Sequence, residues 1–245
     1  MSYIRSVLGI AFNQAVKWDL VAYNVVDRVD SPRVERHQVR PLDSASACKF
    51  LAVVKGERLE TLYSIALSIG LRRGEILGLR WQDLDLEAGT LSVRQAVQRI
   101  RGKGMIFAPP KTDRAQRTIN LPTPVVPSLR KHRRVQLEER LRAGSRWREF
   151  DLVFASNIGT PLEPRNLDRH FKRMLAKAGL PDMRFHDLRH TAASLMLAAN
   201  VNPRTAADIL GHSRISVTLD TYSHVMPAAM HEAADKISAV LWNQN

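Results

Sequence analysis

The chain has few of the residues on which several classes of protein depend. Its 245 residues include one cysteine, Cys48, which excludes an internal disulfide framework and any zinc site built from several cysteines. No uninterrupted apolar run approaches the length of a membrane span, and the N-terminal residues lack the pattern of a secretory signal. We therefore expect a cytoplasmic protein without membrane association, and we expect Cys48 to be a small residue of a helical core.

Acidic residues are also scarce relative to basic ones. The chain has 24 aspartates and glutamates against 37 lysines and arginines, which leaves a formal charge of +13 at pH 7. Such an excess concentrates a protein on a polyanion, so nucleic acid is the leading candidate partner. The charge alone would also suit a ribosomal component.

The hydrophobic spacing divides the chain into a short first segment, a linker and a larger domain. Residues 4–26 have helical spacing, whereas residues 28–41 are polar and contain two prolines. Beyond the linker we predict helices over 44–54 and 59–69, ending at Gly70, and a short helix from Arg72. Strands are predicted over 90–100, 105–108 and 117–121, the last two joined by a polar turn, and mostly helices follow. The pattern predicts a mainly α fold with a small three-stranded antiparallel β-sheet.

Five short motifs carry most of the residues that are suited to chemistry. They are Gly70–Glu75, Pro110–Thr112, His186–His190, Gly211–His212 and Asp220–His224. Together they supply two arginines, a lysine, two histidines and a tyrosine, which suit attack on a phosphodiester without a metal. The transition state gathers negative charge on two non-bridging oxygens, and the arginine fork donates two parallel hydrogen bonds while keeping its charge.

The order and local contexts of these motifs resemble the tyrosine recombinase (phage integrase) family, from about Arg40 to the C-terminus. The resemblance implies the catalytic-domain fold of that family over 42–245, a linker over 29–41, and a remnant C-terminal helix of the core-binding domain over 1–28. We expect most of that core-binding domain to be missing. The implied function is a site-specific recombinase from a phage or mobile element, which cleaves and rejoins double-stranded DNA through a 3′-phosphotyrosine link. The link conserves the bond energy, so the resemblance implies no ATP, no metal and no other cofactor.

The resemblance also assigns roles to individual residues. Arg72 and Arg189 match the paired arginines, and Lys111 matches the general acid that protonates the leaving 5′ oxygen. Tyr222 matches the nucleophile, while His212 matches a histidine that donates to a phosphate oxygen.

The residues themselves refine these roles. Glu75, three residues beyond Arg72, lies on its side of the helix and can buttress its guanidinium, whereas Arg73 points about 100° away. A phenol has a pKa near 10, so Tyr222 needs a base or a cationic setting, and His186 is our candidate to accept its proton. The three other tyrosines lie in apolar helical patterns that suit packing: Tyr3, Tyr23 and Tyr63.

The remaining histidines and basic residues are interpreted more simply. His190 follows His186 by four residues, as in a helical zinc pair, but the intervening Arg189 would repel a cation, so we expect a structural role for His190 and no metal. The basic residues around the predicted hairpin are expected to follow the DNA backbone. They are Arg99, Arg101, Lys103, Arg114 and Arg117. The run 130–134 either does the same or is a solvated helix face.

Two rival functions remain open at the level of sequence. A type IB topoisomerase would use similar chemistry but reseal the same strand, and a truncated, non-catalytic DNA-binding remnant would form no covalent link. For a recombinase we expect a free monomer that assembles on DNA, with a tetramer in synapsis. The apolar spacing over 230–241 predicts a tail helix, which packs either on its own domain or on a neighbouring subunit.

Overall fold

A computed structural model describes residues 2–31, 40–110 and 115–211. Lys111, Arg114, His212, Tyr222 and the expected tail helix therefore lie outside the described residues. The contacts divide the chain into two units, Met1–Val39 and Arg40–Asn245, and each unit is described by itself.

The first unit contains one long helix and one short one. Helix α1 spans Ser2–Lys17 and the 3-10 helix η1 spans Val25–Arg28. Asn24 joins them, because its side-chain oxygen accepts from Val26 N while its amide nitrogen donates to the carbonyl oxygen of Gly9. Tyr3 and Tyr23 were expected to pack, but their exposed fractions within this structure are 80% and 48%. So small a unit has little interior in which to bury large rings.

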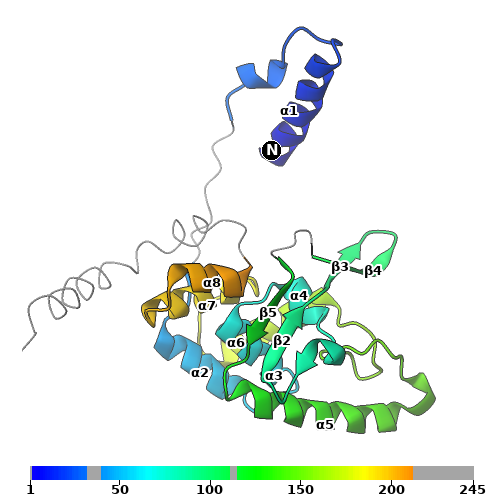
Figure 1. The fold of residues 1–245 in the computed structure, drawn as a ribbon, viewed down its shortest axis with the longest axis vertical. Helices are drawn as coiled ribbons and strands as arrows, with labels where there is room; N and C mark the ends of the chain where they lie inside the picture. The colour runs from blue at the N-terminus through cyan, green and yellow to red at the C-terminus, as the bar shows by residue number, and fades with distance from the viewer. Residues whose placement is uncertain (1, 32–39, 111–114, 212–245) are drawn as a thin grey trace, which may run out of the picture. The chain divides into compact units, whose positions relative to one another are not determined.

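The second unit is built around helix α3 (Figure 1). This helix, Glu60–Ile69, contacts α2 (Ser44–Val54), α5 (Val125–Ala143) and α7 (Asp187–Ala198). Helix α6 (Pro164–Lys177) packs on α2, and α8 (Pro203–Leu210) packs on α7. The short helix α4 (Arg73–Leu77) and the 3-10 helices η2 (Trp81–Asp83) and η4 (Gly144–Arg146) complete the helical elements that the structure describes in this unit.

Two small antiparallel sheets accompany these helices. The first has the order β1-β2-β5, formed by Leu84–Asp85, Thr90–Val93 and Arg117–Asn120. Its register sets Leu91 opposite both Leu84 and Ile119. The second sheet pairs β3 (Ala96–Ile100) with β4 (Gly104–Ala108) as a hairpin, which extends from the side of the unit opposite α5 (Figure 1).

An aromatic cluster fills the centre of the second unit. Phe50, Tyr63 and Phe171 are fully buried, and their ring centroids lie 5.2–6.0 Å apart. The Tyr63 hydroxyl lies 2.7 Å from Nδ1 of His170, so the buried phenol has a polar partner. This core fixes α2, α3 and α6 against one another.

The expected fold class, mainly α with small antiparallel sheet structure, is confirmed. The sequence pattern treated 90–100 as one strand, whereas the structure divides it between two sheets at Arg94 and Gln95. At this break the side-chain amide of Gln95 donates to the carbonyl oxygen of Gly78, which ends α4. As a result β5 pairs with β2, and β4 pairs with β3.

The expectation for Cys48 was wrong, because its side chain is exposed. Helix α2 buries Ala47, Phe50 and Val54, and Cys48 lies one residue away from that stripe, about 100° around the helix. None of the helices within the described ranges has both the length and the apolar content that a membrane crossing requires.

Candidate active site

Arg72 stands at the start of α4, where the chain leaves the end of α3. Its backbone N–H donates to Oε2 of Glu75 at 2.9 Å, and its Nη1 donates to Oε1 of the same carboxylate at 2.8 Å. Nη2 donates to the carbonyl oxygen of Gly211, at the end of α8, at 3.0 Å. The Arg72 side chain is still 41% exposed, so a guanidinium held at two points also faces solvent.

Glu75 is the buried centre of this arrangement. Its side chain is 4% exposed, and Arg117 of β5 donates to both of its oxygens, with Nη2 3.0 Å from Oε2 and Nη1 3.4 Å from Oε1. Burial raises the pKa of Glu75, but the charge and hydrogen bonds of Arg117, together with the hydrogen bonds of Arg72, outweigh that effect and hold it below its ordinary value. Glu75 is therefore a carboxylate, as a buttress for Arg72 requires.

Arg189 reaches the same junction from α7. Its Nη1 donates to the carbonyl oxygen of Gly70 at 2.8 Å, and the residue is 5% exposed. Gly70 ends α3 in a left-handed conformation, with φ of 65°. Arg189 is therefore bonded to a residue only two positions before Arg72, although 117 residues of sequence separate the two arginines.

His186 lies at the first turn of α7, three residues before Arg189. Burial lowers its pKa, and the neighbouring charges of His190 and Arg189 lower it further. The two histidine rings lie 5.5 Å apart and are perpendicular. A lowered pKa leaves His186 neutral at pH 7, and a neutral imidazole can accept a proton.

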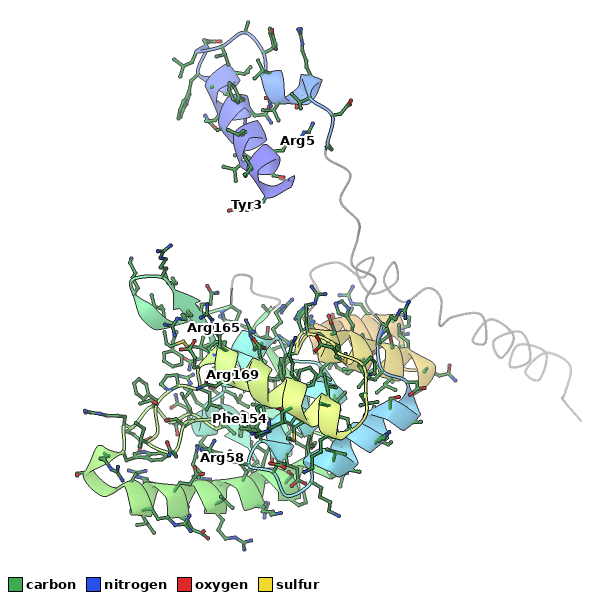
Figure 2. The ribbon with its side chains drawn as sticks, turned by 180° about the vertical axis from the view of Figure 1, so that it is seen from behind. Tyr3, Arg5, Arg58, Phe154, Arg165 and Arg169 are labelled. Atoms are coloured by element: carbon green, nitrogen blue, oxygen red, sulfur yellow. The ribbon has the colours of Figure 1, made fainter. Side chains whose placement is uncertain are left out.

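A cavity of about 1120 Å³ adjoins this junction, and Arg72, Glu75, His186, Pro110 and Gly211 help to line it. Pro110 and Gly211 are the neighbours in sequence of Lys111 and His212. Five further basic residues line the cavity: Arg73, Arg99, Arg165, Lys172 and Arg184. In Figure 2, Arg165 extends from the N-terminal half of α6. The lining thus has six basic side chains, with Arg72, against three acidic ones, Glu75, Glu163 and Asp168.

Sequence reasoning missed three of these residues, Arg165, Lys172 and Arg184. No local motif marks them, since they reach the cavity through the packing of α6 and of the segment before α7. Arg184 is held by the buried Asp187, whose carboxylate accepts from the Arg184 backbone N–H at 2.9 Å and from Nη2 at 3.1 Å. Asp187 lies inside the motif 186–190, and a buried carboxylate requires a basic partner. That requirement was the one signal in the sequence that could have indicated Arg184.

The residues predicted to follow DNA divide into two groups. Arg101 and Lys103 are exposed in the turn of the β3–β4 hairpin, and Arg99 pairs with Glu163 at the start of α6. Arg117 does not fit that prediction, because its side chain is 8% exposed and its nitrogens donate to Glu75 and to two backbone carbonyls. All three guanidinium nitrogens of Arg117 donate to protein acceptors, so its side chain is committed to the protein and not to a phosphate.

Two smaller interpretations can also be compared with the structure. Arg73 pairs with Asp168 of α6 at 2.7 Å, away from Glu75, as the helical rotation predicts. Within 130–134, His132 is buried with its Nε2 2.8 Å from the Val153 carbonyl oxygen, and Arg130 pairs with Glu87. In the part of the chain that the structure describes, no group of three or more histidine, cysteine or acidic side chains could hold a metal ion.

Solved structures show the same fold. The Tn1549 transposon integrase in complex with a circular intermediate DNA superimposes with a TM-score of 0.77 at 23% identity, over 96% of this chain and 78% of that one. The crystal structure of XerA recombinase gives a TM-score of 0.62 at 24% identity, over 82% and 66% of the two chains. The fold is that of tyrosine recombinase catalytic domains.

Sequence comparison supports the same assignment. A "Tyrosine recombinase XerC-like" protein of Caldanaerobacter subterraneus subsp. tengcongensis is 32% identical over 253 residues, which cover 96% of this chain and 64% of the relative. The ICEBs1 integrase of Bacillus subtilis is 26% identical over 97% of this chain and 65% of its own length. Residues 37–228 match the phage integrase family, and the chain belongs to that family. It spans just under two thirds of the length of these two relatives.

Proposed function

We propose that this chain is the catalytic part of a site-specific DNA recombinase, which cleaves and rejoins double-stranded DNA through a covalent tyrosine link. The observation that carries the proposal is that two arginines meet at one short junction, residues 70–72, beside a basic cavity. Arg72 belongs to the junction, and Arg189 is bonded to its first residue, Gly70. Two arginines fixed in this way can stabilise the charge that develops on a phosphodiester under attack. The names of the relatives and the DNA in the similar Tn1549 complex support the same reaction and partner.

In the proposed reaction the Tyr222 oxygen attacks the phosphorus and forms a phosphotyrosine bond at the 3′ side. The bond from phosphorus to the 5′ oxygen breaks, and His186 takes the phenol proton. Lys111 gives a proton to the leaving 5′ oxygen, and His212 donates to a non-bridging oxygen. The 5′ hydroxyl of a partner strand then reverses the step. The number of ester bonds is unchanged, so the proposed reaction requires neither ATP nor a metal.

The proposed roles differ in their support. Those of Arg72, Glu75, Arg189 and His186 draw on the geometry given above, whereas those of Lys111, His212 and Tyr222 rest on their motifs. Exposed basic residues such as Arg101 and Lys103 would bind the DNA backbone, with an affinity that falls steeply as salt rises. We propose a free monomer that assembles on DNA, with a tetramer in synapsis, and action in the cytoplasm.

The decisive experiment traps the covalent intermediate on a nicked suicide substrate. The wild-type chain should form an adduct that survives denaturation, and Tyr222→Phe should bind the same DNA but form none. Tyr23→Phe is the matched control, because it also removes one phenolic hydroxyl and should leave the adduct yield unchanged. Adducts at the wild-type yield in Tyr222→Phe would remove this tyrosine from the mechanism.

A further inference from the structure

A buried ion pair connects two parts of the site that are far apart in sequence. Glu75 of α4 and Arg117 of β5 are 42 residues apart, and their side chains are 4% and 8% exposed. Nη2 of Arg117 lies 3.0 Å from Oε2 of Glu75, and Nη1 lies 3.4 Å from Oε1. Arg72 contacts the same two oxygens through its backbone N–H and its Nη1, so both arginines bind one carboxylate.

Arg117 also holds the end of α8. Its Nε donates to the carbonyl oxygen of Ile209 at 2.7 Å, and Nη1 donates to that of Ala115 at 3.0 Å. A Cβ atom added at Gly211 would lie 2.7 Å from Nη1 of Arg117, so the end of α8 packs directly on the guanidinium. One side chain therefore joins α4, β5 and α8.

Stability alone does not explain a buried ion pair such as Glu75–Arg117. Removing two charges from water costs so much that a buried ion pair is often no more stable than apolar residues of the same size. A further consequence is electrostatic. Arg72 and Glu75 alone would have no net charge, and Arg117 brings the group to a net charge of +1.

We propose that Arg117 is a positioning residue, which acts through Glu75 to hold Arg72 at the cavity and fixes the end of α8 against the same carboxylate. The inference rests on the proposed function, in which Arg72 binds the phosphate under attack. Arg117 contacts no substrate in this arrangement. It keeps Glu75 from neutralising Arg72 completely, and it sets the position of Gly211, whose carbonyl oxygen accepts from Arg72.

The test compares Arg117→Met and Arg117→Lys in the chain as it stands, on the nicked suicide substrate. Arg117→Met should slow adduct formation by about 10²-fold, because small misplacements outside the reacting groups have effects of that size. DNA affinity should change little. Arg117→Lys keeps the charge without the fork and should recover part of the rate. Arg142→Met is the control, since Arg142 is an exposed arginine of α5 that also pairs with a glutamate, and it should leave the rate unchanged.

A second comparison separates action through Glu75 from general damage to the fold. If Arg117 acts through that carboxylate, Arg117→Met should slow a Glu75→Gln protein much less than it slows the wild type. The double variant also replaces the buried pair by neutral groups, so no buried charge is left without its partner. Equal slowing in both backgrounds would overturn the proposal, and so would a wild-type rate in Arg117→Met.

A third measurement does not depend on activity. Arg117 and Arg72 are the charged groups that hold the pKa of Glu75 down, against the effect of burial. In Arg117→Met, NMR titration of the Glu75 carboxyl carbon should show a higher pKa, and the Arg72 Nε–H signal should move. Unchanged signals would overturn the proposal. If the wild-type chain forms no adduct, the proposed function fails, and this measurement still decides whether Arg117 positions Arg72.

Discussion

Gly70→Ala should destabilise the second unit considerably more than a glycine substitution at an uncrowded site. Gly70 has φ of 65°, and a Cβ atom there would lie 2.6 Å from Cδ2 of Leu210 and 3.1 Å from Cβ of Ala192. The left-handed backbone costs a residue with a Cβ about 1–2 kcal/mol. Overpacking of a close-packed interior adds about 1–3 kcal/mol. The crowding arises because α7 and α8 meet the end of α3 at the point where Arg189 is attached.

Gly56→Ala provides the matched control. Gly56 has φ of 82°, and an added Cβ would meet no atom within 4 Å. Both substitutions change the entropy of the unfolded chain in the same way, so that contribution cancels when the two variants are compared. We expect Gly70→Ala to be less stable than Gly56→Ala by about 1–3 kcal/mol, which is the part due to overpacking.

Urea denaturation followed by far-ultraviolet circular dichroism measures this difference. The slope of unfolding free energy against urea should be the same for both variants, so that a change in midpoint reports stability. Equal midpoints for the two variants would refute the close packing of Leu210 and Ala192 around Gly70. That result would also remove the structural basis for placing Arg189 beside Arg72.

Three further predictions follow from individual side chains. The free energy of unfolding should fall as the pH drops through the ordinary histidine pKa of 6.5, because burial lowers the pKa of His132 and the unfolded chain takes up the proton first. Burial lowers the pKa of His170, His186 and His190 as well, so His132→Gln should reduce this dependence, without removing it, in urea denaturation at a series of pH values. Tyr63→Phe should lower the free energy of unfolding by about 0.5–1.5 kcal/mol, because it removes the hydrogen bond to His170, and an unchanged denaturation midpoint would contradict that bond. Lys111→Ala should form adducts slowly on ordinary DNA but be restored by a 5′-phosphorothiolate, whose sulfur leaves without a proton; equal impairment on both substrates would make Lys111 a backbone contact.

Local sequence signals predicted the helices well where one face is buried. Helix α2 spans 44–54 as expected, and Asp43 caps it by accepting from the Ser46 N–H at 2.8 Å. Helix α3 ends at Gly70 because a left-handed residue is needed there. Even Cys48 could have been placed correctly, since the spacing of Ala47, Phe50 and Val54 defines the buried stripe without it.

Contacts between distant segments were beyond the reach of such signals. The strand 90–100 is divided because α4 packs on β3, where an added Cβ at Gly74 or Gly78 would lie 2.8–3.0 Å from backbone atoms. Nothing in the alternating pattern of 90–100 reveals that approach. Arg117 was misassigned for the same reason, since its partner Glu75 belongs to a different element.

The basic residues around the cavity are mostly held by acidic partners, and this arrangement bears on how the site could act. Arg73 pairs with Asp168, Arg99 with Glu163, and Arg184 with Asp187. Ordering a long basic side chain costs about 1.5–2 kcal/mol of conformational free energy, and here folding has already met that cost before any DNA arrives. The carboxylates reduce the net charge of the cavity, so attraction at long range is weaker than the count of arginines suggests. What the pairs provide is fixed geometry, and fixed donors stabilise a developing charge without reorganising during the reaction. A surface that only holds DNA would gain more from unpaired cations, so the pairing supports the proposed reaction on a phosphate.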